Sequence, residues 1–197
     1  MSNYDFNDAD QQGGFELIPA KTVVKAIFNI NPGGIGPSGW LTQSKSSDAE
    51  MIAAEFIVTE GPHAKSRWWG YLVVSGGKQT PDGQSIAGNI SRQTLRAILE
   101  SSRNIKPDDA SPEAAEKRKI SGWGDFNGLT FICRVGIEVD KTGRYDDKNK
   151  ILQIITPDMK EYTASIGGGI PAPAATPIPQ AQATTPPPAS NTPAWAQ

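Results

Sequence analysis

The chain has 197 residues, with 19 Lys and Arg against 21 Asp and Glu, and 37% of its residues are hydrophobic. This composition allows one buried core, and it predicts a single domain with appended segments. The formal net charge of −2 excludes a uniformly basic nucleic-acid coat, so any attraction for phosphate must come from a local patch. No apolar run is long enough for a membrane span and the first ten residues are polar and acidic, so we expect a cytoplasmic protein.

A break in composition near Ile166 separates a globular part from a tail. After Glu161 the chain carries no charged residue, and residues 167–197 are mostly Gly, Pro, Ala, Thr and Gln. Such a segment cannot pack a core. We therefore predict one domain over residues 1–166 and a disordered Gly/Pro/Ala-rich tail over residues 167–197.

Apolar and polar residues alternate in five segments, which predicts five β-strands. The segments are residues 22–30, 50–59, 67–74, 129–140 and 151–156. Residues 31–47, between the first and second strands, contain too many Gly and Pro residues for a regular element. After the third strand, Ser91 is a good N-cap before apolar residues at helical spacing, and this predicts a helix that ends near Arg103. A short charged helix over residues 113–119 and a loop over residues 122–128 complete the expected elements.

The expected order is three strands, one helix and two strands, which is the order of the OB fold. We therefore predict a mainly β protein, a five-stranded OB-fold-like barrel with one helix between its third and fourth strands. In that fold the second and third strands, together with the loops after the first and fourth, form the surface that binds nucleic acids.

The third predicted strand is unusually rich in aromatic residues. Alternation places Trp68 on an apolar face, and Arg67, Trp69 and Tyr71 on the opposite face. A cation beside two flat π-surfaces is typical of surfaces on which unpaired bases stack. The alternative is that Trp69 and Tyr71 pack against the long loops or a second subunit. A bulge or a one-residue slip would exchange the faces, so the sequence leaves open which of Trp68 and Trp69 points outward.

Further basic and aromatic residues occur in the loops that an OB fold would use for binding, and on the neighbouring strands. We predict a nucleic-acid surface formed by Trp40, Lys45, Lys65, Arg67, Trp69, Tyr71, Trp123, Arg134, Lys141, Arg144 and Tyr145. The alternative for each Lys and Arg residue in this set is a solvated surface charge that binds no ligand. A denser basic cluster at residues 117–119 ranks second, because acidic neighbours dilute its charge.

Residue patterns for catalysis and metal binding are sparse. His63 is the only histidine, which excludes a zinc site with several imidazoles and a His-paired nucleophile. Cys133 lies in an alternating apolar run and is expected in the core. The glycines of residues 34–39 match a dinucleotide motif, but Pro37 prevents the helix that such a site needs. We expect no cofactor, no metal and no enzyme activity; the alternative is a magnesium nuclease that uses Asp108, Asp109, Glu113 and Glu116.

Residues 6–10 followed by residues 14–22, and the segment of residues 61–69, resemble motifs of a phage-encoded family of small proteins, formerly a domain of unknown function. Its members are regarded as single-stranded-DNA-binding proteins of OB type. Residues 193–196 also resemble an ending that some members share. The resemblance implies coating and protection of single-stranded DNA during phage replication or recombination in the bacterial host cytoplasm, with little dependence on sequence.

Partners follow from these predictions. We expect single-stranded DNA to bind the domain, no membrane to be involved, and Trp195 in the tail to dock a replication or recombination protein, with drift in an unconstrained segment as the alternative. A homo-oligomer stays open. The second function class is an OB-like adaptor or inhibitor that acts on a host or phage protein, which the acidic overall balance favours.

Overall fold

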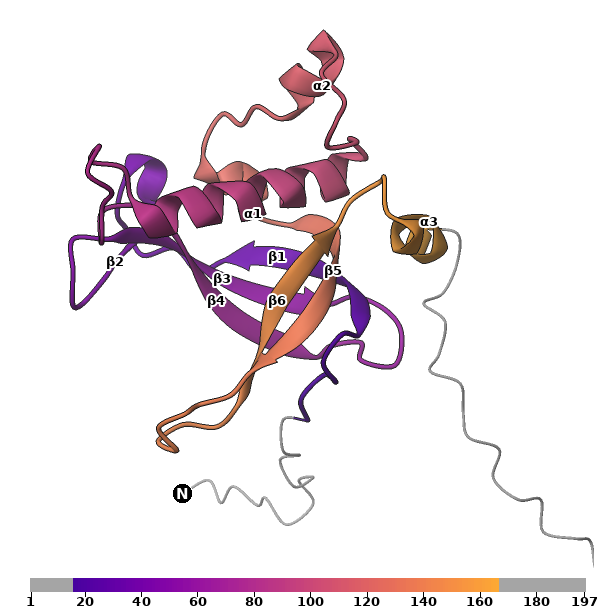
Figure 1. Ribbon diagram of the computed structural model, residues 1–197, viewed down its shortest axis with the longest axis horizontal. Helices are drawn as coiled ribbons and strands as arrows, with labels where there is room; N and C mark the ends of the chain where they lie inside the picture. The colour runs from indigo at the N-terminus through magenta and orange to yellow at the C-terminus, as the bar shows by residue number, and fades with distance from the viewer. Residues whose placement is uncertain (1–15, 167–197) are drawn as a thin grey trace, which may run out of the picture.

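Figure 1 shows the computed structural model, of which residues 16–166 are described. The prediction of a mainly β fold is confirmed, because one antiparallel open sheet of six strands dominates it. The strands are β1 (Val23–Ile30), β2 (Thr42–Gln43), β3 (Glu50–Val58), β4 (Arg67–Ser75), β5 (Leu129–Glu138) and β6 (Lys148–Ile155). The helices are α1 (Ile86–Arg103), α2 (Pro112–Lys117) and α3 (Lys160–Ile166), with 3-10 turns η1 (Pro37–Gly39) and η2 (Trp123–Phe126). None of the described helices is both long and apolar enough to cross a membrane.

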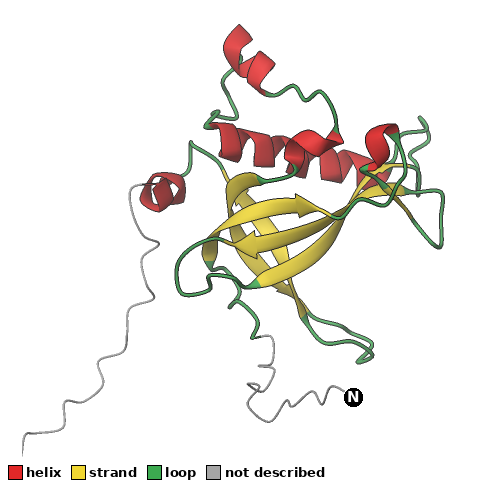
Figure 2. Cartoon of the chain, turned by 180° about the vertical axis from the view of Figure 1, so that it is seen from behind, coloured by secondary structure: helices red, strands yellow, loops and turns green. Residues whose placement is uncertain are grey.

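The long strands lie side by side in the order β4-β3-β1-β5-β6, and each is antiparallel to its neighbours. The short β2 pairs with the first residues of β3, on the edge of β3 that also pairs with β1. β4 and β6 are therefore the two outer long strands, and no ladder among the described residues joins them. The sheet curls beneath α1, which covers one end of it, and the β5–β6 hairpin projects from the other end (Figures 1 and 2).

The core lies inside the curl because one face of each strand is apolar. On β1 and β3 every second residue is buried, and Phe28 lies opposite Phe56 in the register. The Phe28 and Phe56 ring centroids are 5.2 Å apart, and Phe131 of β5 approaches Phe56 edge-on. Leu95, Ile98 and Leu99 of α1 close this core from above. The period of two in the strands and the helical period in α1 thus bury one continuous apolar cluster.

The helix α1 begins before the predicted cap. Ser85, not Ser91, is its N-cap, and the Ser85 Oγ accepts a hydrogen bond from the Gly88 N–H at 3.0 Å. Ser91 is buried inside the helix. Ile86 and Ile90 stand at helical spacing, but Gly88 and Asn89 between them are poor helix formers, and the first turns were therefore missed. The helix ends as predicted at Arg103, because Asn104 takes the left-handed conformation.

The short elements η1, β2, η2 and α3 were not predicted. The loop of residues 31–47 contains η1 and β2, because buried Leu41 folds it back onto β3, and Gly33 permits an approach to Thr42 that a Cβ atom would block. The prediction of five strands is therefore one short strand too few. Beyond β6, Tyr162 of α3 packs on Ile132 and Ile155, so β5 is buried on both faces at Ile132 and its alternation is interrupted there.

Candidate nucleic-acid interface

The two faces of β4 differ sharply. Trp68 is 3% exposed and stacks on Phe56 with ring centroids 5.3 Å apart, whereas Trp69 is 52% and Tyr71 is 69% exposed. The only register shift in the β3–β4 ladder lies at Glu50 and Met51, outside the aromatic segment. The alternation is therefore regular from Arg67 to Leu72. Trp69 points outward, which resolves the alternative that the sequence left open.

Trp69 and Tyr71 line a groove of about 760 Å³ between the two outer strands. The opposite wall is β6, with Lys148, Lys150 and Leu152, and α1 contributes Gln93, Thr94 and Ala97. This groove, called the β4–β6 groove below, lies between the two outer long strands, which no ladder within the described residues joins. It joins an aromatic wall to a wall with two lysines.

The predicted last strand begins at Ile151, so Lys148 and Lys150 of the β4–β6 groove were not among the predicted site residues. The strand begins at Lys148, and buried Asn149 fixes its alternation, so Lys148, Lys150 and Leu152 share one side. Lys148 lies 3.7 Å from Glu138, so its charge is partly balanced. No ion pair within residues 16–166 involves Lys150. Extending the alternation backwards through the polar residues would have found both lysines.

Trp68 also lines the groove from its inner side. Its indole N–H is buried and has no hydrogen-bond acceptor within the described part of the chain. Buried polar groups are nearly always paired, so an orphan donor is an unusual feature of a groove wall.

Arg67 and Arg134 were predicted to contact phosphates. In the structure both are already paired with carboxylates. The Arg67 guanidinium lies 3.2 Å from Glu55 across the β3–β4 ladder. Arg134 of β5 lies 2.6 Å from Glu161 and also donates to Gln153; Gln153 lines the β4–β6 groove, but Arg134 itself does not. Their positive charge is therefore less available to a ligand than the sequence suggested.

The predicted loop residues Lys141, Arg144 and Tyr145 are all exposed in the β5–β6 hairpin, at the end of the sheet opposite α1 (Figure 2). Asp140 organises this turn: its carboxylate accepts hydrogen bonds from the backbone of Tyr145, Thr142 and Arg144 and from the Thr142 hydroxyl. These bonds, the one from the Tyr145 N–H first, lower the pKa of Asp140 to about 2. Lys65 is exposed in the β3–β4 turn, and Lys45 is exposed after β2.

Trp40 and Trp123 form a separate place. They share a cavity of about 520 Å³ with Pro37, Ile120 and Gly124 among its lining residues. The Trp40 indole lies against Gly124 so closely that a Cβ atom there would be 2.7 Å from the indole nitrogen. This cavity and the β4–β6 groove have no lining residue in common. The structure thus brings Trp40 and Trp123 together, but not with Trp69 and Tyr71.

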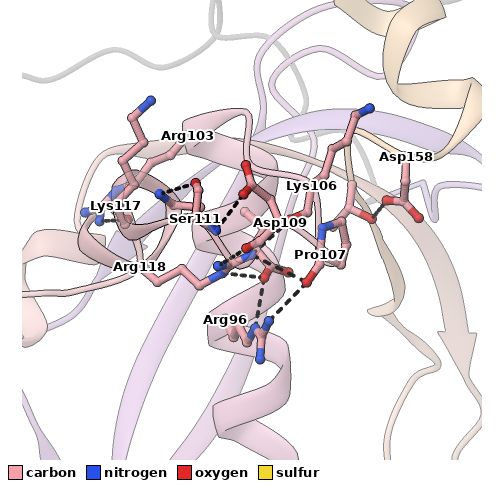
Figure 3. Close-up of polar contacts among 12 residues, drawn as sticks. Arg96, Arg103, Lys106, Pro107, Asp109, Ser111, Lys117, Arg118 and Asp158 are labelled. Atoms are coloured by element: carbon pink, nitrogen blue, oxygen red, sulfur yellow. Dashed lines mark hydrogen bonds and ion pairs between the residues drawn. The ribbon is translucent and has the colours of Figure 1, made fainter.

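The second basic cluster is part of a structural network on α1 (Figure 3). Arg118 donates to buried Glu100 at 2.8 Å and to the backbone carbonyls of Asp109 and Lys106. Arg96 pairs with the same Glu100 oxygen. The guanidinium groups therefore hold residues 105–118 against α1, and Arg118 is taken up by this task.

The carboxylates of the nuclease alternative do not converge. Asp109 accepts a hydrogen bond from the Ser111 N–H, which lowers the pKa of Asp109. Glu113 and Glu116 pair with Lys117 and Lys119 on α2. Within residues 16–166 no group of three or more His, Cys, Asp or Glu side chains is arranged to hold a metal ion.

No family model matches this chain, and no curated protein matches it. The resemblance to phage-encoded single-stranded-DNA-binding proteins therefore stays a prediction. Trp195 and the tail of residues 167–197 lie outside the described residues.

The β4–β6 groove has a definite chemical character. Trp69 and Tyr71 present flat π-surfaces with more than half of each side chain exposed, and the opposite wall presents ammonium groups. Such a surface suits a flexible anionic polymer that carries flat, uncharged groups.

Proposed function

We propose that this chain is a single-stranded-DNA-binding protein that holds the strand in the β4–β6 groove. The observation that carries the proposal is the exposure of Trp69 and Tyr71 on a groove wall that faces Lys148 and Lys150. Trp69 and Tyr71 point outward from an edge strand and so expose apolar surface. Exposed apolar patches often mark binding sites.

The strand order supports the OB-like part of the proposal. Apart from β2, the order β4-β3-β1-β5-β6 with α1 between β4 and β5 is compatible with a partly open five-stranded OB barrel. In such a barrel β3 and β4 are the second and third strands, which form the binding face. Trp69 and Tyr71 lie on the outer side of β4 in this arrangement.

The mechanism is binding without chemistry. Bases stack on Trp69 and Tyr71, each contact contributing about 1–3 kcal/mol, while phosphates lie near Lys148 and Lys150. Exposed Lys141, Arg144 and Tyr145 of the hairpin extend the surface. Since every base has a π-face, little sequence preference follows. The affinity falls with salt, with a slope of about −0.7 per neutralised phosphate.

The proposed role is coating and protecting single strands during phage replication or recombination in the host cytoplasm. This role rests on the resemblance of residues 6–10, 14–22 and 61–69 together with the chemistry of the groove. Trp195 would then dock a replication or recombination protein, as the tail sequence suggests.

Fluorescence anisotropy of a labelled mixed-sequence single strand tests the proposal, with the matching duplex as a control. We expect salt-weakened binding to the single strand, little binding to the duplex, and an oligonucleotide that stays intact in magnesium. Trp69→Ala and Tyr71→Ala should each weaken binding by about 1–3 kcal/mol, roughly 5- to 150-fold. Ile90→Ala is the matched control, because Ile90 is an exposed apolar residue of α1, 62% accessible, that does not line the groove.

Either of two results would overturn the proposal. One is the absence of single-strand binding at low salt by a folded protein. The other is binding that Trp69→Ala and Tyr71→Ala leave as strong as Ile90→Ala does. In the second case the strand is bound elsewhere, with the cavity of Trp40 and Trp123 as the next place to test.

The second candidate function is an OB-like adaptor or inhibitor that binds a host or phage protein. One observation favours it: among the described residues β4 pairs with β3 alone, so its other edge can take an added strand from a partner. If the folded protein does not bind nucleic acid, this edge of β4 and exposed Leu152 of β6 are the first places to test for binding of a partner protein.

A further inference from the structure

A second cavity lies between two segments that are about eighty residues apart in the chain. Its lining comes from the loop around η1, with Pro37 and Trp40, and from residues 120–125 around η2. Trp40, Trp123 and Ile120 also pack against the core, which supports the walls from behind. This space of about 520 Å³ is called the Trp40–Trp123 cavity below. Its volume lies within the range of about 300–1,000 Å³ that is typical of small-ligand sites.

Hydrogen bonds to the sheet hold the segment that carries η2. The Asn127 Oδ1 accepts from the Ile30 N–H of β1 at 2.8 Å, and the Gly128 N–H donates to the Phe28 carbonyl at 2.7 Å. The backbone of this wall is therefore fixed to β1 before any ligand binds, which lowers the cost of ordering a site.

Both indoles of the cavity stay available to a ligand. Trp40 and Trp123 are each only partly buried, and among the ring contacts of residues 16–166 none joins either of them to another aromatic ring. Gly122, next to Trp123, has no side chain to fill the space, and a Cβ atom there would meet no described atom within 4 Å. The ring surfaces are therefore left partly uncovered.

The cavity differs in charge from the β4–β6 groove. Of the described residues that line it, Asp125 alone is charged, whereas two lysines line the groove. The Asp125 carboxylate is exposed, its Oδ2 accepts from the Ser121 N–H at 2.6 Å, and no ion pair within residues 16–166 involves it. This negative charge repels a phosphate and attracts a cation.

A carboxylate beside two indoles suits a flat organic cation. A cation over a tryptophan face is attracted by the ring quadrupole, more strongly than over Tyr or Phe. The guanidinium group of arginine is planar, stacks on aromatic faces and donates two parallel hydrogen bonds to a carboxylate. Ser121 engages Oδ2 of Asp125, which leaves Oδ1 to accept from such a group.

We propose that the Trp40–Trp123 cavity binds an arginine side chain of a partner protein. The guanidinium lies against the indoles and donates to the Asp125 carboxylate. The cavity and the β4–β6 groove share no lining residue, so one chain can hold a strand and this partner at the same time. Arginine binding here does not depend on the proposed function.

NMR titration of the full chain with two small probes tests the proposal. Acetyl-arginine amide presents the side chain as it occurs within a protein, and acetyl-citrulline amide is its neutral isostere, with a urea in place of the guanidinium. We expect the arginine probe to shift the indole N–H resonances of Trp40 and Trp123 saturably, and the citrulline probe to bind about tenfold more weakly. Trp69, exposed but outside the cavity, reports non-specific stacking and should show no saturable shift.

Two substitutions separate the contribution of the charge from that of the rings. Asp125→Asn keeps an oxygen that can accept from the Ser121 N–H but removes the charge, so it should weaken the arginine probe about threefold and leave the citrulline probe unchanged. Asp82→Asn, at an exposed position outside the cavity, is the matched control and should change neither. Trp123→Leu should abolish the saturable shift of Trp40.

Four results contradict the proposal. Equal affinity for the two probes means that the cavity takes flat groups regardless of their charge. The absence of a saturable shift by the arginine probe in the folded protein means that the cavity binds no guanidinium. Tighter binding of thymidine monophosphate than of the arginine probe assigns Trp40 and Trp123 to the nucleic-acid surface. Tighter binding of free arginine than of the capped probe means that the site takes the amino acid and not a protein.

Discussion

Asp140 shows how one side chain sets the shape of a candidate binding loop. Its carboxylate is exposed, yet it accepts four separate hydrogen bonds within the β5–β6 hairpin. The turn presents Arg144 and Tyr145, two of the residues proposed to meet the strand. The order of this loop therefore depends on an acid, although its expected contribution to binding comes from a cation and a ring.

The first prediction concerns the pH dependence of this turn. The pKa of Asp140 is lowered from 3.8 to about 2, so its hydrogen bonds stabilise the turn fully above about pH 4 and are lost as the pH falls through about 2. Carboxyl-carbon NMR titration should give this low value, and the amides of Arg144 and Tyr145 should shift with the same midpoint. Asp140→Ala should release these amides, whereas Asp146→Ala in the same hairpin should not. A midpoint near 3.8 would contradict the prediction.

The second prediction concerns Cys133, which is fully buried in β5. Burial raises the pKa of its thiol well above the usual range, so almost no thiolate is present near neutral pH. We expect no reaction of the native protein with a disulfide reagent and reaction of one thiol per chain after unfolding in denaturant. Rapid native labelling would mean that the core around Phe131 opens far more often than its packing indicates.

At the residue scale, alternation predicted the aromatic face well. It placed Trp69 and Tyr71 opposite Trp68, and the structure agrees because no bulge interrupts this part of β4. Alternation did not reveal ion pairs, since the carboxylates of Glu55 and Glu161 come from other elements. A sequence pattern thus finds the face of a residue more readily than the partner that occupies its charge.

Among the elements, α1 shows how a buried carboxylate can fasten a neighbouring segment. Glu100 is 3% exposed and accepts from both Arg96 and Arg118 at 2.8 Å. Through Arg118 it holds residues 105–118, including α2, against the helix (Figure 3). This segment has few apolar residues of its own, so polar bonds replace hydrophobic packing there.

The third prediction is that Glu100→Ala destabilises the protein by about 2–3 kcal/mol. This value lies below the range of about 3–5 kcal/mol for fully buried pairs, because Arg96 is half-exposed. Urea unfolding would measure the loss. Glu113→Ala is the control: it removes an exposed ion pair to Lys117 and should cost under about 0.5 kcal/mol. Equal losses in the two variants would show that Glu100 is no anchor.

The elements that sequence reasoning missed share a physical cause. β2 and α3 are stabilised by contacts with distant residues: β2 by β3, and α3 by Tyr162 donating to the Ser101 carbonyl at 2.7 Å. Local periodicity carries no trace of such contacts. The long strands were predictable because each buries one complete face, as Phe28 and Phe56 do.

For the molecule as a whole, the decisive feature is a curled sheet whose two outer long strands, β4 and β6, are joined by no ladder within residues 16–166. An OB-like order was predictable from the succession of strands and helix, but the β4–β6 groove was not, because it arises between segments about eighty residues apart. The candidate site therefore combines a predicted wall, Trp69 and Tyr71, with an unpredicted one, Lys148 and Lys150.

The fourth prediction concerns the join between the first and last parts of the domain. Asn149→Ala leaves the Ile18 N–H and two carbonyls, those of Ile18 and Gly136, without their partner. We expect a loss of about 2–4 kcal/mol in urea unfolding, since these groups are buried. Asn89→Ala, which removes one exposed hydrogen bond to Gln84, should change the stability by under about 0.5 kcal/mol. A loss no larger than that of Asn89→Ala would mean that the end of the sheet is held by packing alone.

The same join has a consequence for biosynthesis. Ile18 and Asn149 are 131 residues apart, and a ribosome adding about 5–20 residues per second needs about 7–26 s to make the intervening chain. Throughout that interval buried Ile18 has no β6 to pair with, and for most of it Phe28, Phe56 and Trp68 also lack Phe131. The nascent chain therefore passes through a prolonged stage with its aromatic core exposed, in which a chaperone that shields apolar surface has the most effect on yield.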